Sequence, residues 1–463
     1  MPDKLTYEDL KLGEKAQEAY LRGEPLDYIR ENCPVYLNTR EVFSGLNVTD
    51  LVVAAELAGI PTLLVGDTGC GKSQLVDDIY NAHFNGNISQ GGQGVKIRGK
   101  LDLDVYEEIY TRLNKEKLTR EPTQAVQAMI HYLDEINRCP SPTQNQFFGL
   151  GDGYLEHAGM KLPLGQKGYS WTAATANLGN GEFQGTFSMD KALYNRFGVA
   201  IDFDYEMFSP ASEDEMLIDK LRSADPRIKQ APRKDLTKKI LQANAEINES
   251  AENTGLEASA VINFLRFGTR NCYREGIVQR KGKTWPINCQ DCPNNPEDKS
   301  LCSLLKSPQP RTFQATLRYA SALQYILRLK NPKAEIDSVD LMFKAFELTG
   351  AYQSLLNTNI LNSDYSEQSP LMMANIVERL RNDFRQNQDF ILDSLEQAQQ
   401  GAKLETFFQS EGQIGDYSSL SDKAKEKIPE INPFTDKREI GLSWVKEQGE
   451  LERKIREARR EQE

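Results

Sequence analysis

A glycine-rich stretch near the start of the chain has the residue types and spacing that bind phosphate. The stretch LLVGDTGCGKSQL matches the pattern G-x-x-x-x-G-K-[ST] with Gly66, Gly71, Lys72 and Ser73. Glycines let backbone N–H groups turn toward phosphate oxygens, and the helix that follows directs its positive end at the same anion. We expect Lys72 to reach the β- and γ-phosphates of a nucleotide and Ser73 to bind Mg²⁺.

The whole loop and the start of the following helix are expected to contact the nucleotide. These residues are Gly66, Asp67, Thr68, Gly69, Cys70, Gly71, Lys72, Ser73 and Gln74. Cys70 lies inside the loop, where a positive field is expected to lower the pKa of its thiol. A redox-sensing thiol is one interpretation of Cys70; the favoured one is a small residue that fits the turn.

An acidic pair follows a second apolar run, in AMIHYLDEINRCP. Asp134 suits the shell of the Mg²⁺ ion, and Glu135 suits a base that polarises an attacking water. An isolated Asp-Glu pair is usually a solvated strand end, but a phosphate loop upstream favours the functional interpretation. We therefore expect the bound nucleotide to be hydrolysed.

Three further polar residues are candidates for contacts with the γ-phosphate or with the attacking water. Asn177 ends the apolar run SWTAATANL, where it can orient water near the γ-phosphate if the strands are neighbours. Arg196 precedes the apolar run VAIDFDY and is either a cation for a neighbouring subunit's site or an ordinary surface salt bridge. Arg311 opens the helix-like segment RTFQATLRYASAL, from which a cation could contact the γ-phosphate.

The sequence predicts that the elements positioning these residues form an α/β domain followed by helices. Short apolar β-type runs (TLLVG, GVKIRG, MIHYLDE, SWTAATANL, VAIDFDY) alternate with helical or turn-rich stretches, which predicts a parallel sheet. Four regions are expected: an N-terminal helical entry segment 1–40, an α/β nucleotide-binding domain 41–208, a helical domain 209–356 and a charged helical C-terminal extension 357–463.

Composition restricts the class of protein. A chain of 463 residues with 39% hydrophobic content is long enough for two or three packed domains. A net charge of -12 disfavours a nucleic-acid surface over the whole chain, although a locally basic channel in a ring is compatible with that total. No apolar run is long enough to cross a membrane, and the first residues carry charges where a signal peptide is apolar. We expect a cytoplasmic protein without membrane insertion.

Four of the seven cysteines fall in one insert of the helical domain, 272–302. Cys272, Cys289, Cys292 and Cys302 have the spacing C-x16-C-x2-C-x9-C, and four thiolates can close a tetrahedral metal site. A single C-x-x-C is less regular than the paired knuckles of a zinc ribbon, and a proline directly after Cys292 is typical of iron–sulfur loops. Zn²⁺ and a [4Fe–4S] cluster are both open, as are unliganded cysteines or a disulfide.

Taken in order, five segments of the chain resemble the MoxR-type AAA+ ATPases of the helix-2-insert clade. The segments are GDTGCGKS, YLDEINRCPSPTQNQFFGLGDG, AATAN, MDKALYNRF and SPQPRTFQATLR. The most specific is DEINRCPSPTQN, because members of that group carry a closely similar Asp-Glu-Ile-Asn-Arg followed by proline and a helix containing Thr-Gln. The resemblance covers roughly 42–351, and the cysteine insert and the C-terminal extension depart from it.

The resemblance implies an AAA+ P-loop core with a parallel sheet and helices on both faces, followed by a helical lid. By it, residues 66–73 are the Walker A loop, and Asp134 and Glu135 are the Walker B pair. Asn177 is sensor 1, Arg196 the arginine finger and Arg311 sensor 2. It also implies a hexameric ring with sites between subunits, and a β-hairpin in GYLEHAGMKLPLGQKGY before sensor 1.

The role implied by the resemblance is that of a chaperone. MoxR-type ATPases remodel, activate or load metal into a protein client, often with a separate partner that bears a von Willebrand factor A domain. One alternative is a nucleic-acid-dependent AAA+ motor or a McrB-like restriction NTPase, which the acidic charge and the DEINR segment disfavour. Another is a nucleotide-gated scaffold that hydrolyses slowly and acts through assembly.

The four-cysteine insert gives a direct test of metal binding. The insert has few apolar residues and so lacks a core of its own, which makes a structural metal the favoured role. We expect anaerobically purified protein to contain about one equivalent of zinc or about four of iron, by elemental analysis. Less than about 0.2 equivalents of both metals would contradict the metal site.

Overall fold

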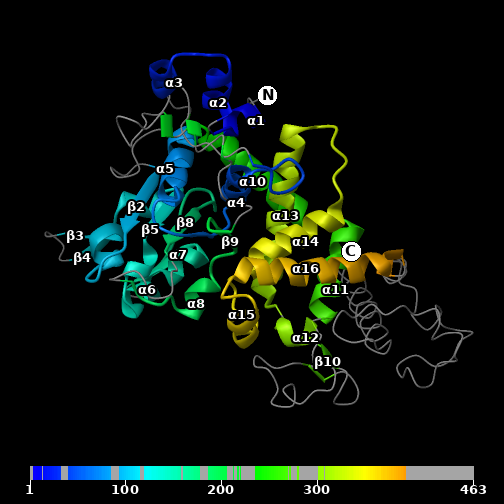
Figure 1. Ribbon diagram of the computed structural model, residues 1–463. Coiled ribbons are helices and arrows are strands. Elements are labelled where there is room, and N and C mark those ends of the chain that lie inside the picture. The colour runs from blue at the N-terminus through cyan, green and yellow to red at the C-terminus, as the bar shows by residue number, and fades with distance from the viewer. Residues whose placement is uncertain are drawn as a thin grey trace, which may run out of the picture. The chain divides into compact units, whose positions relative to one another are not determined.

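The computed structural model describes most of the chain up to residue 392. The described residues are 4–12, 14–32, 40–84, 93–114, 119–157, 160–177, 186–205, 212, 216–217, 219–220, 235–268, 271–272, 279–280, 301–306, 308–389 and 391–392. They belong to two compact units, one of residues 1–252 with 318–336 and one of residues 253–317 with 337–463 (Figure 1). The four regional boundaries expected from the sequence stay predictions.

The first unit is built on a five-stranded sheet in the order β2-β5-β8-β1-β9. All four neighbouring pairs are parallel, which confirms the predicted parallel sheet. The strands are β1 (Thr62–Val65), β2 (Gly94–Arg98), β5 (Ile130–Asp134), β8 (Trp171–Ala176) and β9 (Val199–Asp202). Because the strands are parallel, their carboxyl ends meet at one edge of the sheet, where α/β proteins bind their ligands.

Central strands of this sheet are fully buried. Every residue of β1 and of β8 is buried, which explains why both read as continuous apolar runs rather than as an alternating pattern. The register places Leu64 beside Thr175 and Leu133 beside Ala174, so β1, β8 and β5 end together. The residues that follow these three strands therefore lie near one another.

Helices precede, connect and follow the strands of the first unit. They are α1 (Tyr7–Leu10), α2 (Glu14–Leu21), α3 (Leu26–Asn32), α4 (Val48–Ala58), α5 (Lys72–His83), α6 (Ser141–Gln146), α7 (Phe148–Asp152), α8 (Lys191–Tyr194) and α10 (Thr237–Glu252). Helix α5 packs on β5 and β8, and α4 packs on β1 and α10. Helix α5 thus carries its first turn, with Lys72 and Ser73, to the sheet edge at which the strands end.

Helix α4 begins and ends with strong local signals. Asn47 and Asp50 form a capping box with two bonds of 3.0 Å, and the helix ends at Gly59 in the left-handed conformation (φ 61°). Asp50 also accepts a bond of 2.9 Å from the Tyr7 hydroxyl and one of 3.1 Å from Lys330 Nζ. Asp50 therefore joins three elements of the unit, α1, α4 and α13 (Pro310–Lys330).

Two short hairpins and single turns complete the first unit. β3 (Thr111–Asn114) pairs with β4 (Thr119–Pro122), and β6 (Tyr154–His157) pairs with β7 (Met160–Pro163), each antiparallel. The β6–β7 pair is the hairpin that the family resemblance implies. A π-helical turn at Tyr106–Tyr110 and 3-10 turns at Gln124–Gln127 and Ile136–Arg138 link the strands.

The second unit is mainly helical. Its elements are α11 (Leu256–Gly268), α12 (Leu301–Leu304), α14 (Ser338–Gly350), α15 (Thr358–Asp364), α16 (Ser369–Gln386), β10 (Asn271–Cys272), β11 (Gln279–Arg280) and the first residues of α13. α14 packs on α11 and α16, and the ring of Phe384 lies 5.4 Å from that of Phe264 and 5.8 Å from that of Phe343, edge to face. No helix in the described ranges is long and apolar enough to cross a membrane.

Candidate functional site

The phosphate-loop residues connect β1 to α5. Gly69 and Gly71 have left-handed backbones (φ 86° and 93°), which glycine adopts without strain. Gly71 is the capping position of α5 and has no side chain to accept from the N–H groups of the first turn. Those groups and the positive end of the helix form an anion site of the kind that the sequence predicts.

Lys72 folds back over the loop. Its ammonium is buried and donates to the carbonyls of Gly66 (2.8 Å) and Asp67 (2.6 Å), with Cys70 Sγ 3.3 Å away. The backbone N–H of Asp67 donates to Asp204 Oδ1 at 2.9 Å, which fastens the loop to the turn after β9. Both carbonyl partners of Lys72 are neutral, so its positive charge is available to an anion within the loop.

Cys70 corrects one expectation from the sequence. Burial raises the pKa of the Cys70 thiol, and the charge and hydrogen bond of Lys72 lower it by less, so the pKa lies above its ordinary value. The predicted lowering is therefore wrong, because a cation beside the thiol does not compensate for the lost water. The small-residue interpretation of Cys70 is the one that the geometry favours.

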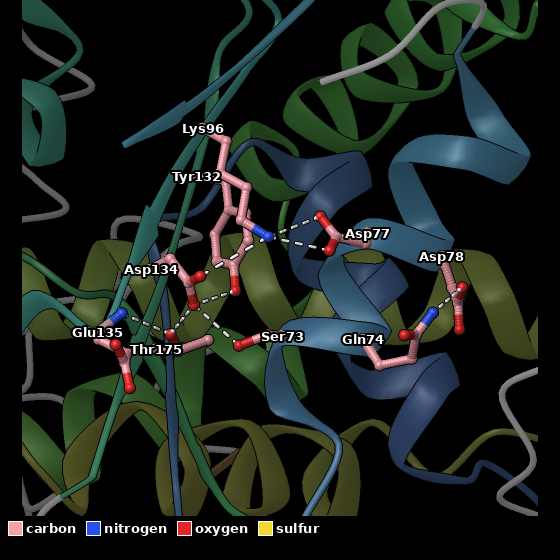
Figure 2. A network of polar contacts seen from close by, with 9 residues as sticks. All are labelled: Ser73, Gln74, Asp77, Asp78, Lys96, Tyr132, Asp134, Glu135 and Thr175. Carbon is pink, nitrogen blue, oxygen red and sulfur yellow. Dashed lines mark hydrogen bonds and ion pairs between the residues drawn. The ribbon is translucent and has the colours of Figure 1, made fainter. Parts of the chain in front are cut away.

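The Asp134 carboxylate is the centre of a hydroxyl network at the sheet edge (Figure 2). Its Oδ1 accepts three hydrogen bonds, from Ser73 Oγ (2.8 Å), Tyr132 Oη (2.7 Å) and Thr175 Oγ1 (3.1 Å). Lys96 Nζ lies 3.7 Å from the other oxygen, Oδ2. The network brings together α5, β2, β5 and β8.

This network keeps Asp134 ionised. Burial raises the pKa of the Asp134 carboxyl, but the bonds from Tyr132, Ser73 and Thr175 and the charge of Lys96 together outweigh it, so the pKa lies below its ordinary value. Ser73 uses its single O–H on Asp134, so its oxygen lone pairs remain for a cation.

Ser73 and Asp134 have the chemistry that Mg²⁺ prefers. Both offer oxygen, and Mg²⁺ is usually bound by one or two such groups together with substrate phosphates rather than by a closed protein cage. The donor set therefore fits a magnesium–nucleotide complex.

Glu135 occupies an unusual backbone conformation directly after β5. It is left-handed (φ 54°), and its N–H donates to Thr175 Oγ1 at 2.9 Å. Gly99 permits this turn, because a Cβ there would lie 2.2 Å from the Glu135 carbonyl oxygen. The Glu135 carboxylate is 2.8 Å from Arg138 Nε, at the solvent-accessible edge. Strained residues of this kind gather at functional sites.

Asn177 follows a strand that is the neighbour of the strand of Asp134, an adjacency that the sequence left open. Strands β5 and β8 pair directly, and Asn177 follows β8 as Glu135 follows β5. The Asn137 amide fixes Asn177, because Asn137 Nδ2 donates to the Asn177 carbonyl (2.7 Å) and Oδ1 accepts from its N–H (3.4 Å). Asn177 therefore lies at the same sheet edge as Asp134 and Glu135.

Two other predicted residues do not join the network within this chain. Arg196 follows α8 and is held by Asp152 Oδ2 (3.2 Å) and the Ala192 carbonyl (2.8 Å), with its guanidinium 4.0 Å from the centre of the Phe148 ring. Gln74 donates to Asp78 Oδ1 at 2.7 Å, one turn along α5 (Figure 2). Their expected roles toward nucleotide stay predictions.

The remaining predicted residues lie in the second unit. Arg311 is exposed in the first turn of α13. Cys272 belongs to β10 and Cys302 to α12, in each case with the side chain outside the described residues. Cys289 and Cys292 lie entirely outside the described residues. The sensor role of Arg311 and the four-cysteine metal site stay predictions.

Sequence reasoning missed four residues of the network: Lys96, Asp77, Tyr132 and Thr175. Lys96 Nζ lies 2.9 Å from Asp77 Oδ2 and 4.6 Å from the centre of the Tyr132 ring. A signal was present for Lys96, since a lysine that interrupts the apolar run GVKIRG needs a partner if the strand is buried. For Thr175 and Asp77, the sequence gives no sign that β8 and α5 lie against β5.

Thr175 can be tested against a matched residue on the same strand. Thr175→Val removes a donor to Asp134 and an acceptor for the Glu135 N–H, whereas Thr172→Val removes only a donor to the Leu150 carbonyl at 3.0 Å. We expect Thr175→Val to lower the free energy of unfolding by about 1 kcal/mol more than Thr172→Val, in urea denaturation. An equal or smaller loss would contradict the importance of the network.

Comparisons with known proteins give one family match and several similar solved structures. Residues 61–197 match the family model described as AAA domain (dynein-related subfamily). Comparison with curated proteins finds no match. Among solved structures, a "putative ATPase" from Cytophaga hutchinsonii is similar with 17% identity and a TM-score of 0.49, over 71% of this chain and 87% of that chain.

A full-length MCM homolog from Methanopyrus kandleri is similar with 13% identity and a TM-score of 0.40, over 74% of this chain and 62% of that chain. The matched range 61–197 contains the phosphate loop, Asp134, Glu135 and Asn177. Residues 61–197 are therefore an AAA domain, the nucleotide-binding module of the AAA+ ATPases.

Proposed function

We propose that this protein is an ATP-hydrolysing, ring-forming AAA+ chaperone of the MoxR type. The observation that carries the proposal is the Ser73–Asp134–Thr175–Glu135 chain of hydrogen bonds. Through it, the phosphate loop, the acidic pair and Thr175, two positions before Asn177, meet at one sheet edge. A domain that only bound nucleotide would not need Glu135 held in a strained turn beside this loop.

Each residue of the edge has a separate task in the proposed reaction. Lys72 and the first-turn N–H groups of α5 bind the phosphates, while Ser73 and Asp134 hold Mg²⁺. The bound Mg²⁺ neutralises phosphate charge. Glu135 orients and deprotonates the attacking water, with Asn177 beside it.

The proposed client is a protein rather than a nucleic acid. The chain has a net charge of -12, whereas proteins that follow a phosphate backbone need dense basic surface. The DEINRCPSPTQN segment and its resemblance support a MoxR-type chaperone that remodels, activates or metal-loads its client in the cytoplasm. A separate protein with a von Willebrand factor A domain is the proposed partner, and a homo-hexamer is the proposed assembly.

Replacement of the base tests hydrolysis. We expect Glu135→Gln to lower kcat for ATP at least about 100-fold, because a positioned base contributes a factor of that order. Binding of a fluorescent ATP analogue should stay within about 3-fold, since Lys72, Ser73 and Asp134 are intact. Glu18→Gln is the matched control, because Glu18 also pairs with an arginine a few positions later in the chain, Arg22, but away from the site, on α2.

Near-normal hydrolysis by Glu135→Gln would contradict the assigned base. The same variant identifies the client, because bound ATP holds the complex together during affinity capture. Capture of nucleic acid alone, with salt-sensitive stimulation of ATPase activity by DNA or RNA, would support the motor in place of the chaperone. Turnover below about 0.01 per second with the true partner present would favour a nucleotide-gated scaffold.

Substitution of Arg196 tests whether the ATP sites lie between neighbouring subunits of a ring. We expect Arg196→Ala to abolish ATP hydrolysis, because an arginine of this kind contributes about 10³- to 10⁵-fold in kcat. If it acts on the neighbouring subunit, mixing Arg196→Ala with Lys72→Ala subunits restores activity, since some mixed sites then have both residues intact. The measurement is steady-state ATPase activity of the mixture. No recovery, under conditions in which wild-type subunits exchange, would contradict action between subunits.

A further inference from the structure

A buried lysine beside the phosphate site belongs to no motif of the sequence. Lys96 lies in β2 with its side chain 9% exposed, and its register partner on β5 is Tyr132. Its ammonium is 2.9 Å and 3.2 Å from the two oxygens of Asp77, 3.7 Å from Asp134 Oδ2 and 4.6 Å from the centre of the Tyr132 ring (Figure 2). Burial of an ammonium is unfavourable unless it is paired, and these three contacts supply the pairing.

The two carboxylates bound by Lys96 come from the two elements that would hold the cation. Asp134 ends β5, whereas Asp77 lies on α5 four residues after Ser73. Residues four apart in a helix share a face, so Asp77 lies one turn along α5 on the side of Ser73. Lys96 therefore connects the helix of Ser73 to the strand of Asp134.

We propose that Lys96 and Asp77 form a positioning bridge that orients the Ser73 hydroxyl and the Asp134 carboxylate for the Mg²⁺ of bound ATP. This inference rests on the proposed function. Three hydroxyl groups donate to Oδ1 of Asp134, and the Ser73 hydroxyl is one of them. Lys96 forms an ion pair with the other oxygen, Oδ2, at 3.7 Å and donates to Asp77 on α5, so it holds the helix of Ser73 against the strand of Asp134.

Lys96 can affect Mg²⁺ binding through its charge or by positioning the ligands, and the two effects predict opposite results when Lys96 is removed. The positive charge of Lys96 repels a divalent cation, so by charge alone its removal strengthens Mg²⁺ binding. As a positioning residue, Lys96 favours the cation by orienting its ligands, so its removal weakens Mg²⁺ binding. The sign of the change thus distinguishes the two effects.

The test is Mg²⁺-dependent binding of a fluorescent ATP analogue to the full chain. We expect Lys96→Met, which keeps the side-chain length, to raise the half-saturating Mg²⁺ concentration about 10-fold, as the loss of groups that orient metal ligands typically does. Binding of the analogue without Mg²⁺ should stay within about 2-fold, because the loop and Lys72 are untouched. Lys96→Arg, which keeps the charge and reaches both carboxylates, should stay within about 3-fold of wild type.

Asp77→Asn tests whether the bridge acts as a unit. We expect the single variant to raise the half-saturating Mg²⁺ concentration and to add little in the background of Lys96→Met, because the two residues act through one another. Additive effects would contradict a bridge. If Lys96→Met does not fold, Asp77→Asn, which leaves no buried cavity, carries the test with Lys96→Arg.

Lys239→Met is the matched control. Lys239 forms a similar partly buried pair with Asp9 (2.9 Å) in the same unit, so its removal shows what the loss of any such pair does to the unit as a whole. The bridge would be overturned if Lys96→Met left the half-saturating Mg²⁺ concentration unchanged, lowered it, or changed it no more than Lys239→Met does. The proposed ATPase would remain intact. Wild-type protein without Mg²⁺-dependent nucleotide binding would overturn the proposed function as well.

Discussion

The site depends on a single oxygen atom, Oδ1 of Asp134, which accepts hydrogen bonds from three hydroxyl groups. The donors come from α5, β5 and β8, so one acceptor sets the distance between the phosphate loop and two strands. Such an arrangement is favourable only if every donor is in place, because an unpaired hydroxyl or a free carboxylate in the interior is costly. The parallel sheet satisfies this condition by ending its strands at the same level.

The same constraint accounts for the residues around the acceptor. Thr175 has two roles, since it donates to Asp134 and accepts from the Glu135 backbone. Gly99 gives the Glu135 turn the room that it needs, because no larger residue fits against its carbonyl. The arrangement of phosphate loop and acidic pair is therefore a property of the sheet edge as a whole, and it cannot be assigned to either motif alone.

Much of the fold could be predicted from the sequence, for identifiable physical reasons. All five parallel strands are correct, because strands buried on both faces read as short continuous apolar runs. The phosphate loop is local, so glycine spacing and its flanking elements suffice to find it. The contact of β5 with β8 could not be predicted, since strand order in a parallel sheet is set by crossovers and not by neighbouring residues.

One property was misjudged and one residue was overlooked because a sequence shows charge but not burial. The thiol of Cys70 was expected to be acidified by its cationic neighbour, but its loss of water has the larger effect on its pKa. Lys96 was not singled out from the sequence, and only the sheet shows that its side chain is enclosed by β5 and α5. The roles expected for Arg196 and Arg311 depend on elements outside one domain, which local pattern cannot supply.

At Glu135, the side chain needed for the proposed hydrolysis conflicts with the residue type that the backbone conformation favours. Its left-handed conformation is one that glycine adopts freely and that a side chain with Cβ adopts at a cost of order 1 kcal/mol. Folding alone would favour glycine there, yet glycine has no carboxylate with which to act on water. A chain selected only for thermal endurance would therefore tend to lose its proposed base first, so activity and robustness oppose each other at this residue.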